Sequence, residues 1–415
     1  MKKLVQSSQI KGTIAAPSSK SYLQRAVACA LLSQGESWLY NVTDSDDYRA
    51  SLNAAVALGA EIETDNTTIR ISGKNFIKSD TIDCKEAGLT LRMFTPIAAL
   101  FYKEITLNGS GSLLKRPFNF IEFPLRMLGA SIETNNGLLP IKVRGPLKGG
   151  HAIVDGSISS QFITGLMIAL PCCEKDSVIT VTSMKSKPYL DMTIDMLDQF
   201  CVEIKTVNNM EFHIPGRQNF VPAAVNIEGD WSGAAFHLVA GAVGGKAVVQ
   251  NLSMQSYQGD KNIVDVLIEC GAGVMVKKNE ITVVKKSLKP FEFDATDCPD
   301  LFPPIAVLAA NCNGTSVIKG AERLKFKESD RALVLKKEFA KAGININIDG
   351  DIMEITGGKI KSCVINSNND HRIAMAAAIL GINAEGPIEI DNAEAVSKSY
   401  PSFYEDYIAL GGSCE

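Results

Sequence analysis

The sequence predicts a mixed α/β protein that is built from six similar units. One short signature, an apolar or small residue followed in most copies by glycine, ends a helical run six times along the chain. A second signature, a polar cluster that opens an apolar helix, recurs with the same step. The step is about 70 residues, which is longer than the common solenoid repeats. The helix-ending signature starts at Leu58, Leu128, Phe200, Cys270, Ala342 and Leu410, and the polar clusters centre on Lys20, Gly88, Ser159, Asp230, Asp300 and Asp370.

Each unit is expected to hold two helices with strands around them. The first helix follows the polar cluster and is rich in small and apolar residues. In some units, such as residues 373–380, it is apolar nearly all round and must be buried. The second helix is amphipathic and ends at the glycine signature. Strand-like segments such as residues 69–71, 281–284 and 344–348 lie around these helices. The six units therefore predict a globular assembly and not an open solenoid.

Composition narrows the class of protein. The chain has 415 residues, too many for one core, so two or more domains are expected. Its hydrophobic content of 46% and charged content of 21% are ordinary for a globular protein. The net charge of -4 argues against binding to nucleic acid or to an anionic membrane, so any basic site must be local.

The cysteines, the first residues and the apolar runs all indicate a cytoplasmic protein. The ten cysteines are scattered without a C-x-x-C pair, which favours reduced thiols over disulfides or a zinc site. Residues 1–8 lack the apolar core of a signal peptide. The apolar run at residues 162–170 stops at Pro171, well short of the roughly 20 residues that span a membrane.

The stretch from Arg323 to Arg331 places cations where a helix begins. The spacing of apolar residues predicts a helix from Ala332 to Gly343, with Ser329 as its N-cap. A helix N-terminus carries partial positive charge, so the neighbouring cations are unfavourable unless something compensates for them. Either an anionic ligand binds there, or Glu328 and Asp330 neutralise the cations on a solvated surface.

Other predicted helix N-termini also carry polar and cationic residues. The six polar clusters are rich in Ser, Gly, Asp, Lys and Arg, and Arg116 with Pro117 opens a further helix. If these N-termini face one cleft, they bind a small ligand with several negative charges, such as a phosphate ester with carboxylates. The sequence lacks a G-x-x-x-x-G-K-[ST] motif, a convincing dinucleotide fingerprint and H-E-x-x-H, and its four histidines lack metal-ligand spacing. No cofactor and no metal are expected.

Two carboxylates, Asp300 and Glu328, accompany these lysine and arginine residues. Neighbouring cations lower the pKa of a carboxyl group and burial raises it, so one group could act as base and the other as acid. The alternative is that each is a helix cap or an ion-pair partner. Because both occur in units with anion-binding features, catalysis is the favoured interpretation.

Eight motifs, taken in their order along the chain, resemble the motifs of one known family. They are Ser19-Lys-Ser with Arg25, Leu113-Leu-Lys-Arg-Pro, Gly156-Ser-Ile-Ser-Ser-Gln, Ser186-Lys-Pro-Tyr, Gln258-Gly-Asp, Lys327-Glu-Ser-Asp-Arg, Asp370-His-Arg-Ile-Ala-Met and Ser397-Lys. The chain resembles the 5-enolpyruvylshikimate-3-phosphate synthases, the 3-phosphoshikimate 1-carboxyvinyltransferases of the shikimate pathway, from Ser19 to about Tyr404. The resemblance implies the enolpyruvyl transferase fold, with three units per domain, buried helices and sheets outside. It also implies one domain from residues 1–18 and 229–415, a second from residues 19–228, and an active site in the cleft between them.

The family transfers the enolpyruvyl group of phosphoenolpyruvate to the 5-hydroxyl of shikimate 3-phosphate and releases phosphate, in the biosynthesis of chorismate and the aromatic amino acids. The resemblance assigns catalysis to Asp300, Glu328 and Lys20. It assigns shikimate 3-phosphate to Lys20, Ser21, Arg25, Ser159, Ser160, Gln161, Ser186, Asp300 and Lys327. It assigns phosphoenolpyruvate to Lys20, Gly88, Arg116, Gln161, Arg331, Arg372 and Lys398. The expected partners are these small molecules and neither nucleic acid nor membrane, and a monomer is expected.

Some residues depart from the family pattern, and two other functions stay open. Glu86 and Leu89 stand where the family usually has Asn and Thr, and Arg323 stands where some relatives have Asn. These departures predict altered affinity around phosphoenolpyruvate and glyphosate. The nearest rival is the UDP-N-acetylglucosamine enolpyruvyl transferase, whose loop cysteine is missing from residues 108–117 here. A non-catalytic anion-binding relative is the other alternative, and the pair Asp300 and Glu328 argues against it.

Overall fold

The computed structural model describes residues 1–74 and 76–415 and divides the chain into two compact units. Unit 1 contains Met1–Pro17 and Glu228–Glu415, and unit 2 contains Ser18–Ile227. These bounds lie one residue from the expected domain boundaries. Each unit has its own apolar core.

Unit 2 contains three four-stranded sheets. Their strand orders are β14-β3-β5-β4, β6-β7-β9-β8 and β10-β11-β13-β12. The strands are β3 (Glu36–Tyr40), β4 (Glu61–Asp65), β5 (Thr68–Ser72), β6 (Thr81–Asp83), β7 (Ile105–Asn108), β8 (Ser131–Asn135), β9 (Leu138–Arg144), β10 (Gly150–Asp155), β11 (Ser177–Thr182), β12 (Lys205–Val207), β13 (Glu211–Ile214) and β14 (Ala224–Asn226). The helices are α1 (Lys20–Leu32), α2 (Asp46–Ala57), α3 (Gly88–Ala98), α4 (Glu122–Met127), α5 (Ser160–Ala169) and α6 (Lys187–Gln199), with single 3₁₀ turns η1 (Gly111–Lys115), η2 (Asn119–Ile121) and η3 (Leu170–Cys172).

Unit 1 repeats this plan. Its sheets have the orders β16-β17-β15-β2, β18-β19-β21-β20 and β22-β23-β1-β24. The strands are β1 (Lys2–Gln6), β2 (Ile10–Ala15), β15 (Gly245–Gln250), β16 (Gly273–Lys277), β17 (Glu280–Val284), β18 (Glu292–Asp294), β19 (Thr315–Lys319), β20 (Asn345–Asp349), β21 (Ile352–Thr356), β22 (Cys363–Asn366), β23 (Ile388–Asp391) and β24 (Ser413–Cys414). The helices are α7 (Trp231–Gly244), α8 (Ile263–Glu269), α9 (Phe302–Ala310), α10 (Arg331–Lys341), α11 (His371–Leu380) and α12 (Phe403–Ala409), with η4 (Gly259–Asn262), η5 (Pro299–Leu301), η6 (Ala321–Phe326), η7 (Gly381–Asn383) and η8 (Ala393–Lys398).

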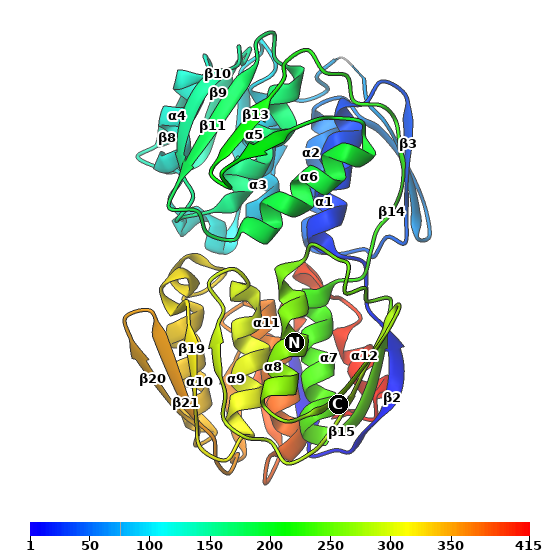
Figure 1. Cartoon of the computed structure of the whole chain (residues 1–415), viewed down its shortest axis with the longest axis vertical. Coiled ribbons are helices and arrows are strands. Elements are labelled where there is room, and N and C mark those ends of the chain that lie inside the picture. The colour runs from blue at the N-terminus through cyan, green and yellow to red at the C-terminus, as the bar shows by residue number, and fades with distance from the viewer. Residues whose placement is uncertain (75) are drawn as a thin grey trace. The chain divides into compact units, whose positions relative to one another are not determined.

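The predicted repeat of two helices per unit is confirmed. The first helices α3, α5, α9 and α11 each connect two parallel strands of one sheet, as α3 connects β6 with β7 and α9 connects β18 with β19. Parallel strands need such a crossover, whereas the next strands pair antiparallel through hairpins. Figure 1 shows one such arrangement in unit 1, where β19, β20 and β21 lie along an outer edge and α9 and α10 lie inside it.

The first helices are buried on every side, because sheets and other helices surround them. All eleven residues of α3 and all nine residues of α9 are buried. The second helices are amphipathic: α10 buries Leu335 and Phe339 but exposes Leu333. The buried helices and outer sheets of the predicted enolpyruvyl transferase fold are therefore confirmed.

Two buried helices, α1 and α7, do not connect strands of one unit. β2 precedes α1 in the sequence, but it pairs in parallel with β15 of unit 1. β14 precedes α7 in the sequence, but it pairs in parallel with β3 of unit 2. The chain thus passes between the units twice, after Pro17 and after Ile227. Each passage brings the chain directly to the N-terminus of a buried helix.

Candidate functional site

In unit 1 the predicted base, Asp300, lies among three cations that come from separate segments. Oδ1 of Asp300 accepts hydrogen bonds from Nη1 of Arg331 at 2.7 Å and from Nζ of Lys327 at 3.2 Å. Its Oδ2 accepts from Nη2 of Arg372 at 3.0 Å. Asp300 lies in η5, Lys327 follows η6, Arg331 opens α10 and Arg372 lies in α11. The fold therefore brings Asp300 and Arg372 together with the Lys327–Arg331 stretch, from which they are 27 or more residues away in the sequence.

Arg331 is held by carboxylates on several sides. Its side chain is 1% exposed, and it donates to Asp300, to Glu328 and to Asp370. Asp370 is fully buried and also caps α11 by accepting from the backbone N–H of Arg372 at 3.0 Å. Glu328 thus neutralises Arg331 as one sequence-based alternative expected, and Asp300 and Asp370 also take part, which the sequence did not suggest.

The predicted N-cap of α10 was wrong. The helix begins at Arg331, and the side chain of Asp330 caps it by accepting from the backbone N–H of Leu333. Ser329 instead donates its hydroxyl hydrogen to Oδ2 of Asp370 at 3.0 Å. A serine and an aspartate one residue apart are both good caps, so composition alone could not decide between them.

The neighbouring cations determine the ionisation of Asp300. Burial by itself would raise the pKa of Asp300, but Arg372, Lys327 and Arg331 together hold this pKa well below its usual range. Burial lowers the pKa of Lys327, which Asp300 partly restores. Burial also works against the charge of Arg372, and Asp300 raises the pKa of Arg372 overall. Asp300 is therefore a carboxylate at neutral pH and can accept a hydrogen bond or a proton.

Lys398 lies next to the same cap. It is 8% exposed, and its Nζ donates to the backbone carbonyl of Asn369 at 2.6 Å. Lys398 ends η8, and Asn369 directly precedes Asp370. The structure therefore brings Lys398 to the N-terminus of α11, where the positive end of a helix and a lysine together suit an anion.

In unit 2 the predicted residues gather at the N-termini of α1, α3 and α5. Nζ of Lys20, the first residue of α1, donates to Oδ2 of Asp47 at 2.7 Å. Arg25, one turn further on, is 1% exposed and donates to the carbonyl of Ser21 and to the hydroxyls of Thr164 and Thr193. Burial lowers the pKa of Arg25 to about 10. Arg25 is thus fixed by α1, α5 and α6.

A second group in unit 2 centres on Gly88, which opens α3. A Cβ added at Gly88 would lie 2.7 Å from Nη1 of Arg116, 3.4 Å from Nη1 of Arg92 and 3.8 Å from Oε1 of Gln161. Nη1 of Arg92 donates to Oε1 of Gln161 at 2.8 Å, and the guanidinium of Arg92 lies 5.3 Å from the ring centre of Phe118. Three residues predicted for phosphoenolpyruvate, Gly88, Arg116 and Gln161, therefore lie side by side.

The predicted serines also lie at helix starts. Ser159 caps α5, because its hydroxyl accepts from the backbone N–H of Gln161 at 3.2 Å, and Ser160 opens the helix. Ser186 precedes α6 in a left-handed backbone conformation, with φ of 57°. A non-glycine residue in that conformation is uncommon and is found repeatedly at ligand sites.

The three departures from the family pattern have local contacts. The carboxylate of Glu86 accepts from the backbone N–H of Ser112 at 3.3 Å, in the turn that leads to Arg116. Leu89 is buried in the core of unit 2. Nη1 of Arg323 donates to the carbonyl of Thr296 at 2.6 Å. The predicted change in affinity stays a prediction.

Four residues of these networks were missing from the predicted site. Arg92 lies one helical turn after Gly88, so helical spacing could have suggested it. Asp370 was a repeat anchor and opened the motif Asp370-His-Arg-Ile-Ala-Met but received no role, although its position before an apolar helix marks it as a cap. Asp260 lies in the motif Gln258-Gly-Asp but received no role, and its partner Ser232 is 28 residues away. Asp47 gave no usable signal, because its partner Lys20 is 27 residues away.

Two searches of the described residues gave negative results. No group of three or more His, Cys, Asp or Glu side chains that could hold a metal ion occurs within residues 1–74 and 76–415. Over the same ranges, no helix has the length and apolar character to cross a membrane.

Comparison with known proteins identifies the family. The family model described as EPSP synthase (3-phosphoshikimate 1-carboxyvinyltransferase) matches residues 4–407. The chain belongs to the EPSP synthase family. Among curated relatives, the 3-phosphoshikimate 1-carboxyvinyltransferase of Clostridium novyi (strain NT) is 40% identical, covering 98% of this chain and 96% of the relative. That of Clostridium kluyveri is 39% identical with the same coverage.

Solved structures agree with the EPSP synthase assignment. The EPSP synthase of Acinetobacter baumannii at 2.37 Å superposes with a TM-score of 0.86 and 25% identity, covering 100% of this chain and 99% of that one. The enolpyruvyl transferase NikO from Streptomyces tendae superposes with a TM-score of 0.80 at 16% identity, covering 100% and 98%. The second likeness supports the enolpyruvyl transferase fold alone. The predicted family, enzyme class and shikimate-pathway role are confirmed.

Proposed function

We propose that the two residue groups described above carry out the reaction of the EPSP synthase family. The protein transfers the enolpyruvyl group of phosphoenolpyruvate to the 5-hydroxyl of shikimate 3-phosphate and releases phosphate. The observation that carries the proposal is the environment of Asp300, a carboxylate that three cations from three segments keep ionised and oriented. A residue that only capped a turn would not need three cations.

Shikimate 3-phosphate is assigned to the α1 and α5 starts of unit 2. Lys20, Ser21 and Arg25 come from α1, Ser159, Ser160 and Gln161 from the start of α5, and Ser186 from the turn before α6. The phosphate brings about -1.5 to -2 charges near neutral pH. Hydroxyls, backbone N–H groups at a helix start and a lysine are suitable donors for such a group. Arg25 also makes bonds within the protein, and these hold α1, α5 and α6 in place around this site.

Phosphoenolpyruvate is assigned to Arg116, Gln161, Lys20 and the backbone at Gly88 in unit 2, and to Arg331, Arg372 and Lys398 in unit 1. Planar guanidinium groups bind carboxylate or phosphate with two parallel hydrogen bonds, whereas Lys398 supplies a point charge. Arg331 is occupied by Asp300, Glu328 and Asp370. Binding of an anion by Arg331 therefore requires that one of these carboxylates gives up its hydrogen bond.

Asp300 is assigned as the base and Glu328 as the acid. Asp300 takes the proton from the 5-hydroxyl as that oxygen bonds to C2 of phosphoenolpyruvate, and Glu328 gives a proton to the methylene carbon. The resulting tetrahedral intermediate loses a methyl proton and phosphate, and the double bond re-forms. The cations weaken Asp300 as a base in the free protein. Anionic substrates that draw Lys327 and Arg372 towards themselves would raise the pKa of Asp300 and strengthen it as a base.

Lys20 is assigned to both substrates. Its ammonium is paired with Asp47 at 2.7 Å, and both side chains are about one-eighth exposed, at 13% and 12%. Asp47 holds the ammonium at the start of α1, where a flexible lysine can turn towards an incoming phosphate. The assignment predicts that Lys20 changes partner when the substrates bind.

The test is phosphate release from phosphoenolpyruvate. We expect release with shikimate 3-phosphate and none when UDP-N-acetylglucosamine replaces it. Release only with the UDP sugar would support the rival transferase. If the protein binds phosphoenolpyruvate and shikimate 3-phosphate in calorimetry but releases no phosphate with either acceptor, it is a non-catalytic relative. A cytoplasmic location, a monomeric state, and the lack of a cofactor and of nucleic-acid partners stay predictions.

A further inference from the structure

Unit 2 has a cavity of about 1020 Å³ at the ends of the three helices whose N-termini carry the site residues. It is lined by the segments that follow α1, α3 and α5, and by the segments that return from the three hairpins. Representative lining residues are Leu31, Leu100, Cys172, Lys74, Lys148 and Arg217. Because α1, α3 and α5 separate the cavity from the proposed substrate-binding residues of unit 2, it is not part of the proposed catalytic site.

In unit 1 a side-chain amide joins the corresponding helix ends. Asn383 ends η7, the 3₁₀ turn after the third buried helix, and its Nδ2 donates to the carbonyl of Val243 at 3.0 Å and to Oδ1 of Asn311 at 2.8 Å. Val243 and Asn311 end the other two buried helices, so Asn383 ties the three helix ends together. Cys172 takes the same position in unit 2, at the end of η3. A thiol side chain is too short and too weak a donor to make these two bonds.

The floor of the cavity is apolar. Leu31, Leu58, Leu147 and Phe220 are buried beneath it, and Leu100 is partly exposed to it. The negative ends of the three helices also point this way. Backbone N–H groups of the return segments cap some of these carbonyls, as Leu147 does for Ala99 at 2.9 Å and Arg217 for Cys173 at 2.7 Å. The floor suits an uncharged, hydrophobic group.

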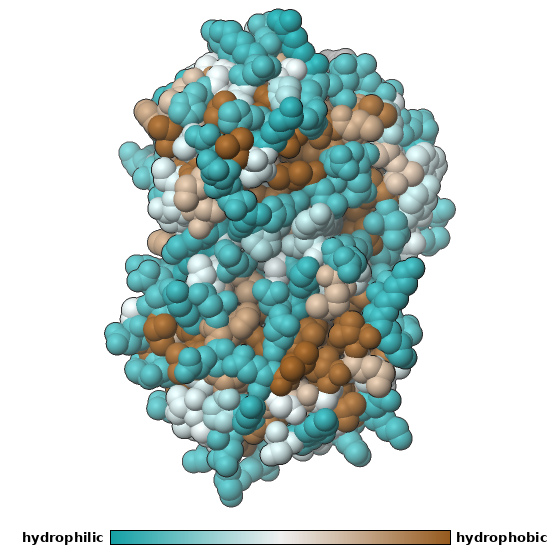
Figure 2. Space-filling view, in the orientation of Figure 1, coloured by the Kyte–Doolittle hydropathy of each residue, from teal (hydrophilic) through white to brown (hydrophobic). Residues whose placement is uncertain are grey.

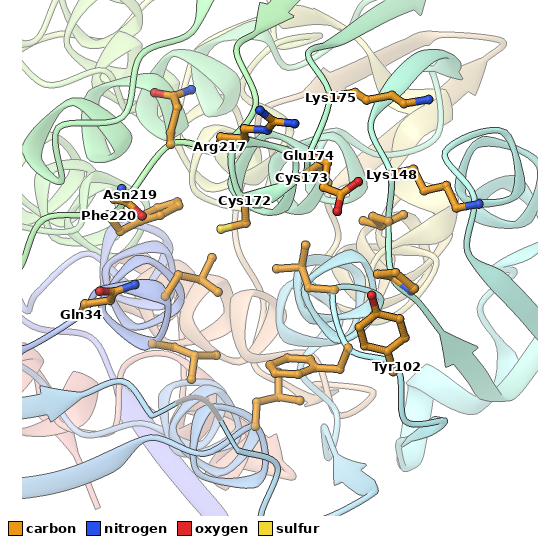
Figure 3. A pocket seen from close by; sticks show the side chains of 18 of the residues that line it. Gln34, Tyr102, Lys148, Cys172, Cys173, Glu174, Lys175, Arg217, Asn219 and Phe220 are labelled. Carbon is orange, nitrogen blue, oxygen red and sulfur yellow. The ribbon is translucent and has the colours of Figure 1, made fainter.

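The rim is cationic. Lys74, Lys148, Lys175 and Arg217 line the cavity together with a single acid, Glu174. Figure 3 shows Lys148, Lys175 and Arg217 around the cavity, with Cys172 near its middle. Lys74 has a nearby acid, Glu61, at 3.4 Å. The rim therefore carries a local positive charge in a chain whose net charge is -4.

We propose that this cavity binds a small organic anion, with an apolar ring system on the leucine floor and a carboxylate or sulfonate at the lysine rim. Its volume is at the upper end of the range of small-molecule pockets, roughly 300–1,000 Å³. The helix ends disfavour an anion on the floor, and the lysines favour one at the rim. A ligand with charge at one end is therefore bound in one orientation. A fully polar anion, such as inorganic phosphate, gains nothing from the floor.

The test uses 8-anilinonaphthalene-1-sulfonate, whose fluorescence rises in an apolar site, with saturating shikimate 3-phosphate and phosphate present to fill the catalytic anion sites. We expect one molecule of the sulfonate to bind per chain even with these two anions present. The double variant Lys148→Glu with Lys175→Glu should weaken binding at least about tenfold, because the sulfonate then meets two carboxylates. The matched control is Lys336→Glu with Lys337→Glu, the same change of charge on the exposed face of α10. The control should bind as the unchanged protein does.

A second probe separates the contribution of the sulfonate charge to binding from that of the ring system. N-phenyl-1-naphthylamine has the same ring system without the sulfonate, and we expect both double variants to bind it equally. The proposal fails if shikimate 3-phosphate and phosphate displace the sulfonate completely, or if both double variants bind it equally. It also fails if Lys148→Glu with Lys175→Glu loses the uncharged probe to the same extent as the sulfonate. Binding is measured without turnover, so a failure here leaves the proposed catalytic function untouched. Conversely, an inactive protein that binds the sulfonate as expected would contradict only the catalytic proposal.

Discussion

The carboxylate of Asp370 binds the guanidinium of Arg331 at two points, with Oδ2 2.8 Å from Nε and Oδ1 3.3 Å from Nη2. Both side chains are almost completely buried, at 0% and 1% exposure. Asp370 caps α11 with the same carboxylate, and Arg331 opens α10. The pair therefore joins the starts of two helices that carry proposed site residues.

Asp370→Asn should destabilise the protein, because it leaves Arg331 buried with one negative partner fewer. Removing one partner of a buried ion pair costs about 3–5 kcal/mol, and the remaining carboxylates place this variant near the lower value. Urea unfolding measures the change. The control is Asp44→Asn, which removes an ion pair to Arg49 whose two side chains are more than half exposed. That control should lose less than about 1 kcal/mol. Equal losses would mean that the buried pair contributes no more than a surface pair.

Asp300→Asn and Glu328→Gln keep the shape of each side chain and remove its proton chemistry. Each should lower kcat by roughly 10²–10⁴-fold, the usual contribution of general acid–base catalysis. Steady-state phosphate release measures kcat, and calorimetry checks that both substrates still bind. Glu322→Gln, at an exposed glutamate on η6, is the matched control and should keep full activity. Unchanged turnover in either variant would remove that residue from the proposed mechanism.

Gly88→Ala should weaken phosphoenolpyruvate binding. The new methyl group would lie 2.7 Å from Nη1 of Arg116, closer than real Cβ contacts allow, so Arg116 must move. We expect the KM for phosphoenolpyruvate to rise by about tenfold or more, because a misplaced guanidinium loses its paired hydrogen bonds. The KM for shikimate 3-phosphate should change much less.

Gly358→Ala is the control for this substitution. A Cβ at Gly358 would meet open space, and that residue is exposed. Both KM values should stay as in the unchanged protein. Equal KM values in Gly88→Ala and Gly358→Ala would show that Arg116 does not bind phosphoenolpyruvate.

The repeat and the helices could be predicted because they depend on local sequence. A step of about 70 residues and the all-apolar first helices are visible without any three-dimensional information. The sheets that β2 and β14 join could not be predicted from the repeat, because both strands precede equivalent helices and periodicity does not specify the partner sheet. The family resemblance supplied the two chain crossings instead.

The chemistry of the site was partly predictable for the same reason. Asp300, Lys327 and Arg331 were chosen from motifs, but their mutual hydrogen bonds join segments 27 and 31 residues apart. The neutralisation of Arg331 was expected from its neighbours in sequence and comes in part from Asp370, 39 residues away. Long-range ion pairs of this kind leave no periodic signal in a single sequence.

Asp260 makes the stability of the protein depend on pH. Burial raises its pKa to about 7, and the charges of Asp300 and Asp230 add to the rise, while Arg372 and a hydrogen bond from Ser232 oppose it. The folded state therefore holds a proton that the unfolded state releases above the ordinary pKa of 3.8. Where the folded state binds more protons, stability falls as pH rises. The contribution of Asp260 is thus most favourable below pH 4 and declines until the pH passes 7.

Asp260→Asn removes this dependence, because an amide does not ionise. Its stability relative to the unchanged protein should increase between pH 5 and pH 8 by roughly 1–3 kcal/mol, because about two pKa units of the rise fall within this range. Urea unfolding at the two pH values measures the difference. The exposed Asp265 on α8 provides the control, and Asp265→Asn should show the same difference at both pH values. If Asp260→Asn also shows the same stability difference at both pH values, Asp260 is ionised in the folded protein throughout this range. The charge of Arg372 would then lower the pKa of Asp260 by more than burial raises it.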